Sequence, residues 1–172
     1  TSPALDPPTF ADIQSAARRL ADIAVITPVL ESSLLNERLG GRLLVKAEPL
    51  QRGGSFKVRG AYNRIYHLDD VARKTGVVTF SSGNHAPGVA MAAKSLGVPA
   101  GIGMRADALE SKIDNNLAHG AEVVFDDREK GNREASAEKL AAERYATLVR
   151  SYDDPHIIAG QGTVGLELAY QA

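Results

Sequence analysis

The sequence has 172 residues, of which 44% are hydrophobic and 24% are charged, with a formal net charge of −1 at pH 7 and no cysteine. This is the composition of an ordinary globular protein, and the length is enough to bury one core and part of a second. The balanced charge offers no basic field for nucleic acid, and no apolar run is long enough to cross a membrane. Without cysteine, no disulfide framework or thiolate metal site can form. We therefore expect a cytoplasmic protein that binds neither nucleic acid nor a membrane.

Helix signals and chain breakers alternate over the first part of the chain. Thr9 and Asp12 form the pattern of a capping box, and apolar residues recur at helical spacing after it. Pro28 ends this segment, because the residue before a proline is pushed towards an extended conformation. A short helix closed by two glycines is predicted over residues 33–39, and a buried strand is predicted over residues 43–45.

Short apolar segments alternate with helical patterns over the rest of the chain, after a helix expected at residues 56–67. The expected strands cover residues 77–80, 100–104, 122–125 and 148–149. The expected helices cover residues 85–96, about 111–119 and about 132–145, and a charged loop is expected over residues 126–130. Strands separated by helices of this length pair in parallel through right-handed crossovers. We predict an α/β fold with an open parallel sheet and flanking helices.

One lysine follows a glycine pair at the start of a predicted helix, in the segment GGSFKVRGA (residues 53–61). A single lysine in a first turn most often points to solvent. Burial in an apolar setting, or a nearby cation, would instead lower the pKa of Lys57 and free its amine to form a Schiff base with a carbonyl. Phe56 and Val58 are the candidate apolar walls, and Arg59 is the candidate cation.

A second segment, SSGNH (residues 81–85), lies in the turn between an expected strand and an expected helix. Free backbone N–H groups and the helix dipole make such a turn attractive to anions. Pro87 is compatible with this placement because it falls in the first turn of the helix. The alternative role for Asn84 is an Asx-turn or a helix cap.

These two segments resemble those of the threonine dehydratase and serine racemase family, which are pyridoxal-phosphate enzymes of the tryptophan-synthase-β fold type. The resemblance covers nearly the whole chain and rests on residues 46–63, 81–85, 120–124 and 153–163. Family members usually carry glutamine at position 87. The resemblance implies three parts: the N-terminal part of a larger domain (residues 1–47), a small α/β domain (48–152), and the start of an incomplete return into the larger domain (153–172).

The resemblance also implies a chemistry for both segments. Lys57 would hold pyridoxal 5′-phosphate through a Schiff base and then remove the α-proton of a small amino-acid substrate. Phe56 would pack near the cofactor, and Asn84 would contact its ring hydroxyl. The implied substrate-binding residues are Ser81, Ser82, Gly83, Asn84 and His85. The implied reaction is dehydration and deamination of threonine or serine to a 2-keto acid and ammonia. The alternative is serine racemisation, with Ser82 as the second base.

Two other patterns suggest functions that we do not favour. Residues 160–165 match the dinucleotide fingerprint GxGxxG, but the acidic residue expected about 20 positions later falls beyond Ala172. The resemblance implies instead that this segment opens a helix of the larger domain. His67, His119 and His156 lack metal-ligand spacing, so we expect no metal site.

The resembled family holds the cofactor phosphate in a glycine-rich loop downstream of the lysine, and the 172 residues contain no counterpart of it. We therefore expect half an active site. We also expect the chain to form a homo-oligomer or to associate through its incomplete domain. The rival interpretation is a non-catalytic fragment that folds or mediates an interaction without turning over a substrate.

Overall fold

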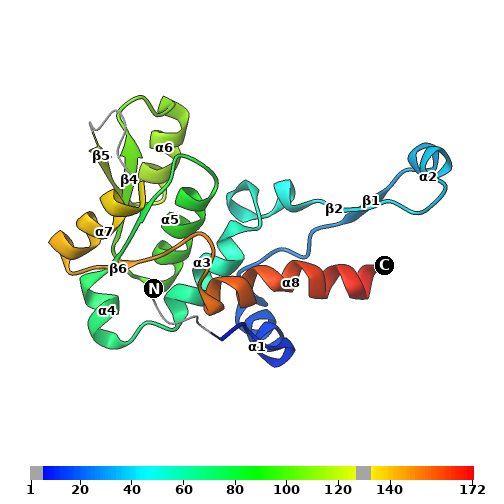
Figure 1. Ribbon diagram of the computed structural model, residues 1–172, viewed down its shortest axis with the longest axis horizontal. Coiled ribbons are helices and arrows are strands. Elements are labelled where there is room, and N and C mark those ends of the chain that lie inside the picture. Colours follow the sequence, from blue (N-terminus) through cyan, green and yellow to red (C-terminus); the bar gives the residue numbers. More distant parts are fainter. Residues whose placement is uncertain (1–5, 127–132) are drawn as a thin grey trace.

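The computed structural model describes residues 6–126 and 133–172, and Figure 1 shows their arrangement. The α-helices are α1 (Phe10–Leu20), α2 (Ser33–Leu39), α3 (Lys57–Tyr66), α4 (Asp70–Thr75), α5 (His85–Leu96), α6 (Glu110–Ala118), α7 (Arg133–Arg144) and α8 (Pro155–Gln171). The strands are β1 (Val29–Glu31), β2 (Leu44–Lys46), β3 (Val77–Phe80), β4 (Ala100–Arg105), β5 (Glu122–Asp126) and β6 (Thr147–Leu148). Two short 3₁₀ helices, η1 (Glu48–Leu50) and η2 (Arg52–Gly54), precede α3.

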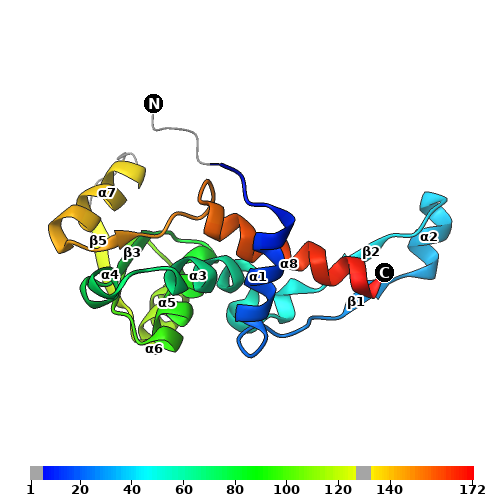
Figure 2. The same cartoon turned by 90° about the horizontal axis from the view of Figure 1, so that it is seen from below.

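Parallel strands form the central sheet, in the order β5-β4-β3-β6. The inner strand β3 is buried along most of its length, which agrees with a sequence that is apolar except for Thr79. Figure 2 shows α7 on one face of this sheet and α5 and α6 on the other. The predicted α/β fold with an open parallel sheet and flanking helices is confirmed.

The main hydrophobic core joins the sheet to α3 and α5. Ile65 of α3, Val89 of α5 and Ile102 of β4 are all fully buried in it. Burying each aliphatic side chain of this size contributes about 1.5–3 kcal/mol to folding. This packing fixes the carboxyl end of β3 and the first turn of α5 relative to α3.

Two glycines from other helices enclose the first turn of α3. A Cβ atom at Gly88 of α5 would lie 3.1 Å from the Cβ of Lys57. A Cβ atom at Gly160 of α8 would lie 2.5 Å from the backbone oxygen of Arg59. Glycine at both positions therefore lets the helix backbones approach more closely than a side chain would allow. The position of Lys57 is consequently set from both sides.

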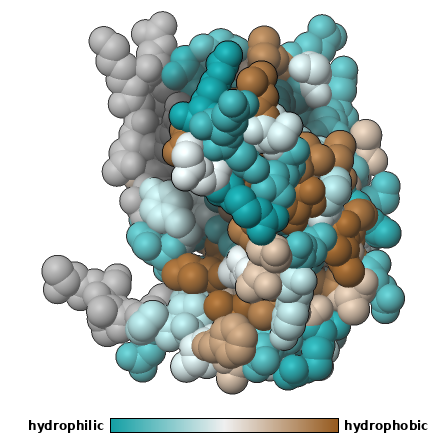
Figure 3. Space-filling model, turned by 90° about the vertical axis from the view of Figure 1, so that its right-hand side faces the viewer, coloured by the Kyte–Doolittle hydropathy of each residue, from teal (hydrophilic) through white to brown (hydrophobic). Residues whose placement is uncertain are grey.

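An arm made of β1, α2 and β2 extends from the rest of the molecule, at the right of Figure 1. The two strands pair antiparallel, and α2 between them has no buried residue. Figure 3 views the molecule from this end and shows apolar side chains among the polar ones on its surface. The burial predicted for residues 43–45 is wrong, because β2 pairs only with β1 in this two-stranded ribbon. Leu43 and Val45 are 39% and 49% exposed.

The bounds predicted for α2, β3 and α5 are confirmed, whereas β1 and α4 were not predicted because they are short and lack a clear periodicity. The GxGxxG segment at residues 160–165 lies inside α8 and not in a strand-to-helix turn. This placement agrees with a helical segment and contradicts a dinucleotide loop. The charged loop expected at residues 126–130 begins inside β5, and its remaining residues lie outside the described part of the chain.

Candidate active site

Lys57 opens α3, and its amine lies in a partly desolvated position. Nζ donates a hydrogen bond to the backbone carbonyl of Ser151 at 3.0 Å and lies 5.1 Å from the centre of the Phe56 ring. Desolvation by burial lowers the pKa of the Lys57 amine. A lower pKa increases the share of neutral amine, which is the form that attacks a carbonyl group.

Arg59 is not the nearby cation that the sequence predicted for Lys57. Its fully buried guanidinium is bonded to the carboxylates of Glu48 and Glu167, at distances between 2.6 and 3.0 Å. The prediction is wrong because residues two positions apart lie on different faces of a helix. Burial alone lowers the pKa of Lys57.

The segment SSGNH connects the carboxyl end of β3 to the start of α5, as predicted. The backbone N–H of Ser81 donates to the carbonyl of Gly103 at 3.1 Å and continues the pairing of β3 with β4. The N–H of Gly83 donates to Ser81 Oγ, also at 3.1 Å, and this bond tightens the turn. Ser82 and Gly83 are exposed at the tip of the turn.

Asn84 occupies the N-cap position of α5, but its side chain makes no capping hydrogen bond. The helix-cap alternative for Asn84 is therefore not realised. The residue is exposed, so its amide can reach a bound molecule. The first N–H groups of α5 have no intrahelical partner and point in the same direction.

His85 is the buried member of the turn, with 4% of its surface exposed. Its Nε2 lies 3.1 Å from the carbonyl oxygen of Val149, which can only accept, so Nε2 carries the proton. Its Nδ1 is buried without a hydrogen-bond partner. Desolvation lowers the pKa of His85 to about 4, and the charge of Lys57 acts in the same direction. His85 is thus neutral near pH 7 and ties the turn to the segment after β6.

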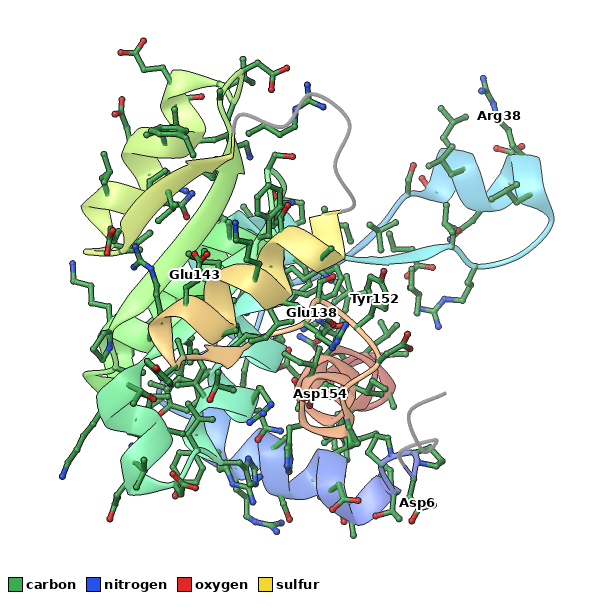
Figure 4. All side chains as sticks on the ribbon, turned by 60° about the vertical axis from the view of Figure 1, so that its left-hand side comes forward. Asp6, Arg38, Glu138, Glu143, Tyr152 and Asp154 are labelled. Atoms are coloured by element: carbon green, nitrogen blue, oxygen red, sulfur yellow. The ribbon has the colours of Figure 1, made fainter. Side chains whose placement is uncertain are left out.

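The turn forms one wall of a cleft with a volume of about 690 Å³. The other lining residues include Ala137, Arg150, Ser151, Tyr152 and Asp153. Figure 4 shows Tyr152 in the segment between β6 and α8, close to Asp154 at the start of α8. The amine of Lys57 lies at the edge of this cleft, bonded to the carbonyl of Ser151.

The sequence analysis did not identify residues 150–153 as part of this site. The available signal was their position just after β6, because ligands bind at the carboxyl ends of parallel strands in open α/β sheets. No motif marks residues 150–152, and only the fold brings residues 150–153 into the same cleft as residues 81–83 and His85. In the described residues, including this site, no group of three or more His, Asp or Glu side chains could hold a metal ion. No helix of the described residues is long and apolar enough to span a membrane.

Comparison with known proteins identifies the family. Residues 20–172 match the family described as pyridoxal-phosphate dependent enzyme, and the chain belongs to it. The chain is 44% identical to serine racemase of Schizosaccharomyces pombe over 161 residues, which cover 94% of this chain and 50% of that protein. It is 46% identical to L-threo-3-hydroxyaspartate ammonia-lyase of Pseudomonas sp over 160 residues, which cover 93% of this chain and 50% of that protein.

A solved structure supports the same assignment. Threonine deaminase of T.th. is 47% identical and superposes with a TM-score of 0.86, over 96% of this chain and 52% of that one. The chain thus has the fold of fold-type II pyridoxal-phosphate enzymes. It spans about half the length of the relatives it matches.

Pyridoxal phosphate is the cofactor of this family, and the residues near Lys57 fit its aldehyde and ring. The fit rests on three observations: an amine with a lowered pKa, an aromatic ring beside it, and an exposed side-chain amide at the start of α5. Lys57 would hold the aldehyde carbon, Phe56 would pack near the ring, and Asn84 would donate to the ring hydroxyl. The cofactor would supply an electron sink for charge that develops on the substrate.

Proposed function

We propose that Lys57 binds pyridoxal phosphate covalently and that a protein containing this chain removes ammonia from small β-hydroxy amino acids. The observation that supports this most directly is the position of the Lys57 amine. It is partly desolvated and lies at the edge of a cleft that is also lined by residues 81–83 and by His85, the first residue of α5. An amine beside an anion-binding turn suits a substrate that has both an α-proton and a carboxylate.

Each residue of the two segments has a role in this proposal. Nζ of Lys57 anchors the cofactor and later accepts the α-proton of the substrate. The substrate carboxylate binds to the hydroxyl of Ser81 or Ser82 and to those backbone N–H groups of residues 81–85 that do not already donate within the protein. Neutral His85 holds the turn in place through its bond to the Val149 carbonyl, so the turn needs no rearrangement to receive the anion.

The favoured reaction is the loss of the β-hydroxyl and the amino group from threonine or serine, which yields a 2-keto acid and ammonia. Similarity to an L-threo-3-hydroxyaspartate ammonia-lyase and to a threonine deaminase supports a β-hydroxy amino acid as substrate. Similarity to serine racemase supports a second candidate reaction. In racemisation, Ser82 would return a proton from the opposite side of the α-carbon, and its exposed position in the cleft wall permits this.

The share of each relative that this chain spans is relevant to its domain organisation. Because the chain spans about half of each relative, we propose that residues 48–152 form a small domain. Residues 1–47 and 153–172 would belong to a larger domain, and residues outside these 172 would complete that domain. The proposed half-site therefore supplies the lysine and the substrate turn, and we expect the 172 residues alone to turn over little substrate.

Covalent capture of the cofactor tests the proposal. Added pyridoxal phosphate should produce a shifted absorbance band, and reduction with borohydride should fix the cofactor on Lys57, as read by peptide mass spectrometry. Lys57→Ala should abolish the labelled peptide, whereas Lys74→Ala, at an exposed lysine of α4, should not. Labelling scattered over surface lysines would contradict the proposal.

Turnover is then measured in a protein that contains this chain within the full length of its relatives. Keto-acid release from threonine and serine, and D-serine formation, should both depend on Lys57. Loss of a positioned base alone costs about 10²–10⁴ in rate, and loss of the covalent anchor adds to this. The ratio of keto acid to D-serine decides between dehydration and racemisation.

A further inference from the structure

His67 and His156 form a stacked pair of rings where α3 meets α8. The ring centres are 4.0 Å apart, and the ring planes differ by 16°. His67 directly follows the last residue of α3, and His156 lies in the first turn of α8. Neither residue lines the cleft beside Lys57. The pair therefore has no part in the chemistry proposed above, although both of its rings can take up a proton near neutral pH.

Hydrogen bonds of Asn63 join three helices at the stacked rings. Nδ1 of His67 lies 2.7 Å from the backbone carbonyl oxygen of Asn63, which can only accept, so Nδ1 carries a proton. The side chain of Asn63 is buried. Its Nδ2 donates to the backbone carbonyl of His156 at 2.7 Å, and its Oδ1 accepts from Arg19 at 3.1 Å. Separation of the two rings would therefore disturb the junction of α1, α3 and α8.

The stack is compatible with one added proton but not with two. A cationic ring is attracted to the face of a neutral aromatic ring, whereas two cationic rings with centres 4.0 Å apart repel each other. Repulsion at this distance separates the two protonation steps of a coupled pair by about 1–3 pH units. Desolvation by burial, and then the charge of His67, lowers the pKa of His156 from its ordinary value of 6.5. The second proton therefore enters only in the acidic range.

The neighbouring charges do not remove this repulsion. The other titratable or charged residues around the pair are Asp6, Asp12, Arg19, Arg64, Tyr66 and Asp154. Asp154 favours a charged His156, but its carboxylate already bonds to Arg64 at 2.7 Å and caps α8. Asp12 is used in the capping box of α1. Arg19 and Arg64 add positive charge and lower the pKa of His156 further.

We propose that the His67–His156 stack is a latch that responds to protons: it holds α3 to α8 while it carries at most one added proton, and it opens when both rings are charged. The open form binds more protons than the closed form, so the latch is closed above about pH 6.5 and opens as the pH falls below that value. The segment just before His156 carries Ser151, whose carbonyl accepts from Nζ of Lys57 at 3.0 Å. Opening therefore displaces the acceptor that positions this amine, whatever reaction the cleft performs.

The test follows the 172-residue chain by NMR as the pH is lowered from about 8 to about 4.5. We expect the ring resonances of His67 and His156 to titrate in two separate steps. The backbone amides of residues 150–157 and the side-chain amide of Asn63 should move in the second step only. His67→Phe keeps a flat ring in the stack but cannot take up a proton. In this variant the midpoint of His156 should rise by about 1 pH unit or more, and residues 150–157 should stay in place.

Two further variants complete the test. His156→Phe is the reciprocal change and should also abolish the second step. His119→Gln is the control, because it removes another histidine with a lowered pKa, at the end of α6, and should change neither the steps nor the movement. His85, with a pKa of about 4, is present in every variant, so its own titration cancels. Midpoints that ignore the partner ring, two charged rings without movement of residues 150–157, or movement that persists in both Phe variants would each overturn the proposal.

Discussion

The guanidinium of Arg59, two residues after the candidate catalytic lysine, is held inside the protein by ion pairs. Its guanidinium bonds to Glu48 and Glu167, and Lys46 bonds to Glu167 at 2.6 Å. The cluster therefore balances two cations against two carboxylates. Buried charges persist only when they are paired and hydrogen-bonded, and removing one partner leaves the others uncompensated. Arg59 consequently joins α3 to both η1 and α8.

Replacing Arg59 with methionine should cost stability out of proportion to the loss of one side chain. We expect Arg59→Met to lower the free energy of unfolding by about 3–5 kcal/mol, because the buried carboxylate of Glu48 loses its cation and Glu167 keeps only Lys46. The measurement is urea denaturation at pH 7. Arg42→Met is the matched control, since Arg42 makes a similar bond of 2.8 Å to Glu31 but is exposed, and its loss should cost under about 1 kcal/mol. Similar losses in the two variants would contradict the argument.

His85 should make the stability depend on pH. Its pKa is about 4 in the folded protein, below the ordinary value of 6.5, because burial penalises the charged ring. Between those values the unfolded chain binds the proton more readily, so stability is complete above about pH 6.5 and falls as the pH drops to 4. The shift corresponds to a loss of about 3 kcal/mol over that window.

His85→Gln isolates this contribution, because glutamine can donate to the Val149 carbonyl but does not titrate. The free energy of unfolding is compared at pH 7 and pH 4 in the two proteins. The variant should lose less stability on acidification, whatever its stability at pH 7. Burial also lowers the pKa of His119 and His156, but they remain in both proteins and cancel in the comparison. Equal losses on acidification would show that His85 is not held neutral.

At the scale of elements, the position of α3 depends on contacts that a side chain would prevent. Its backbone lies against Gly88 of α5 and Gly160 of α8. The sequence could predict α3 and α5, because their apolar residues recur at helical spacing and the turn before α5 has recognisable chemistry. It could not predict that Arg59 faces α8, or that residues 150–153 line the cleft. Both facts depend on how helices and loops pack, and periodicity along one element carries no information about its partners.

Alanine substitutions in α8 test the close approach. Gly160→Ala should destabilise the protein by about 1–3 kcal/mol, because the new Cβ would lie 2.5 Å from a backbone oxygen of α3 and would push the helices apart. Gly165→Ala on the same helix is the control, since nothing lies within 4 Å of its added Cβ. That variant should gain up to about 1 kcal/mol from the better helix propensity of alanine. Thermal unfolding measures both, and equal effects would rule out the contact as the cause.

At the scale of the whole molecule, the central sheet and the arm differ in how they are stabilised. The sheet has helices on both faces, whereas the arm consists of a two-stranded ribbon and a helix with no buried residue. The sequence predicted α2 correctly. It also predicted that the strand at residues 43–45 is buried, whereas Leu43 and Val45 are exposed in the structure. A run of apolar residues indicates that a surface is to be covered. It does not indicate whether the same chain or another chain covers that surface.

The arm should therefore mediate association of the 172-residue chain. Leu34 and Leu39 of α2 are 56% and 64% exposed, and exposed apolar surface of this kind is removed from water when two copies pair. Sedimentation velocity over a range of concentrations should show a dimer or larger species. The double variant Leu34→Glu and Leu39→Glu should shift the chain to monomer without lowering its thermal stability at low concentration, because neither side chain is buried. Val71→Glu, at an apolar residue of α4 that is also exposed, should leave association unchanged. A monomer at every concentration, or equal effects of the α2 and α4 variants, would exclude the arm as the contact surface.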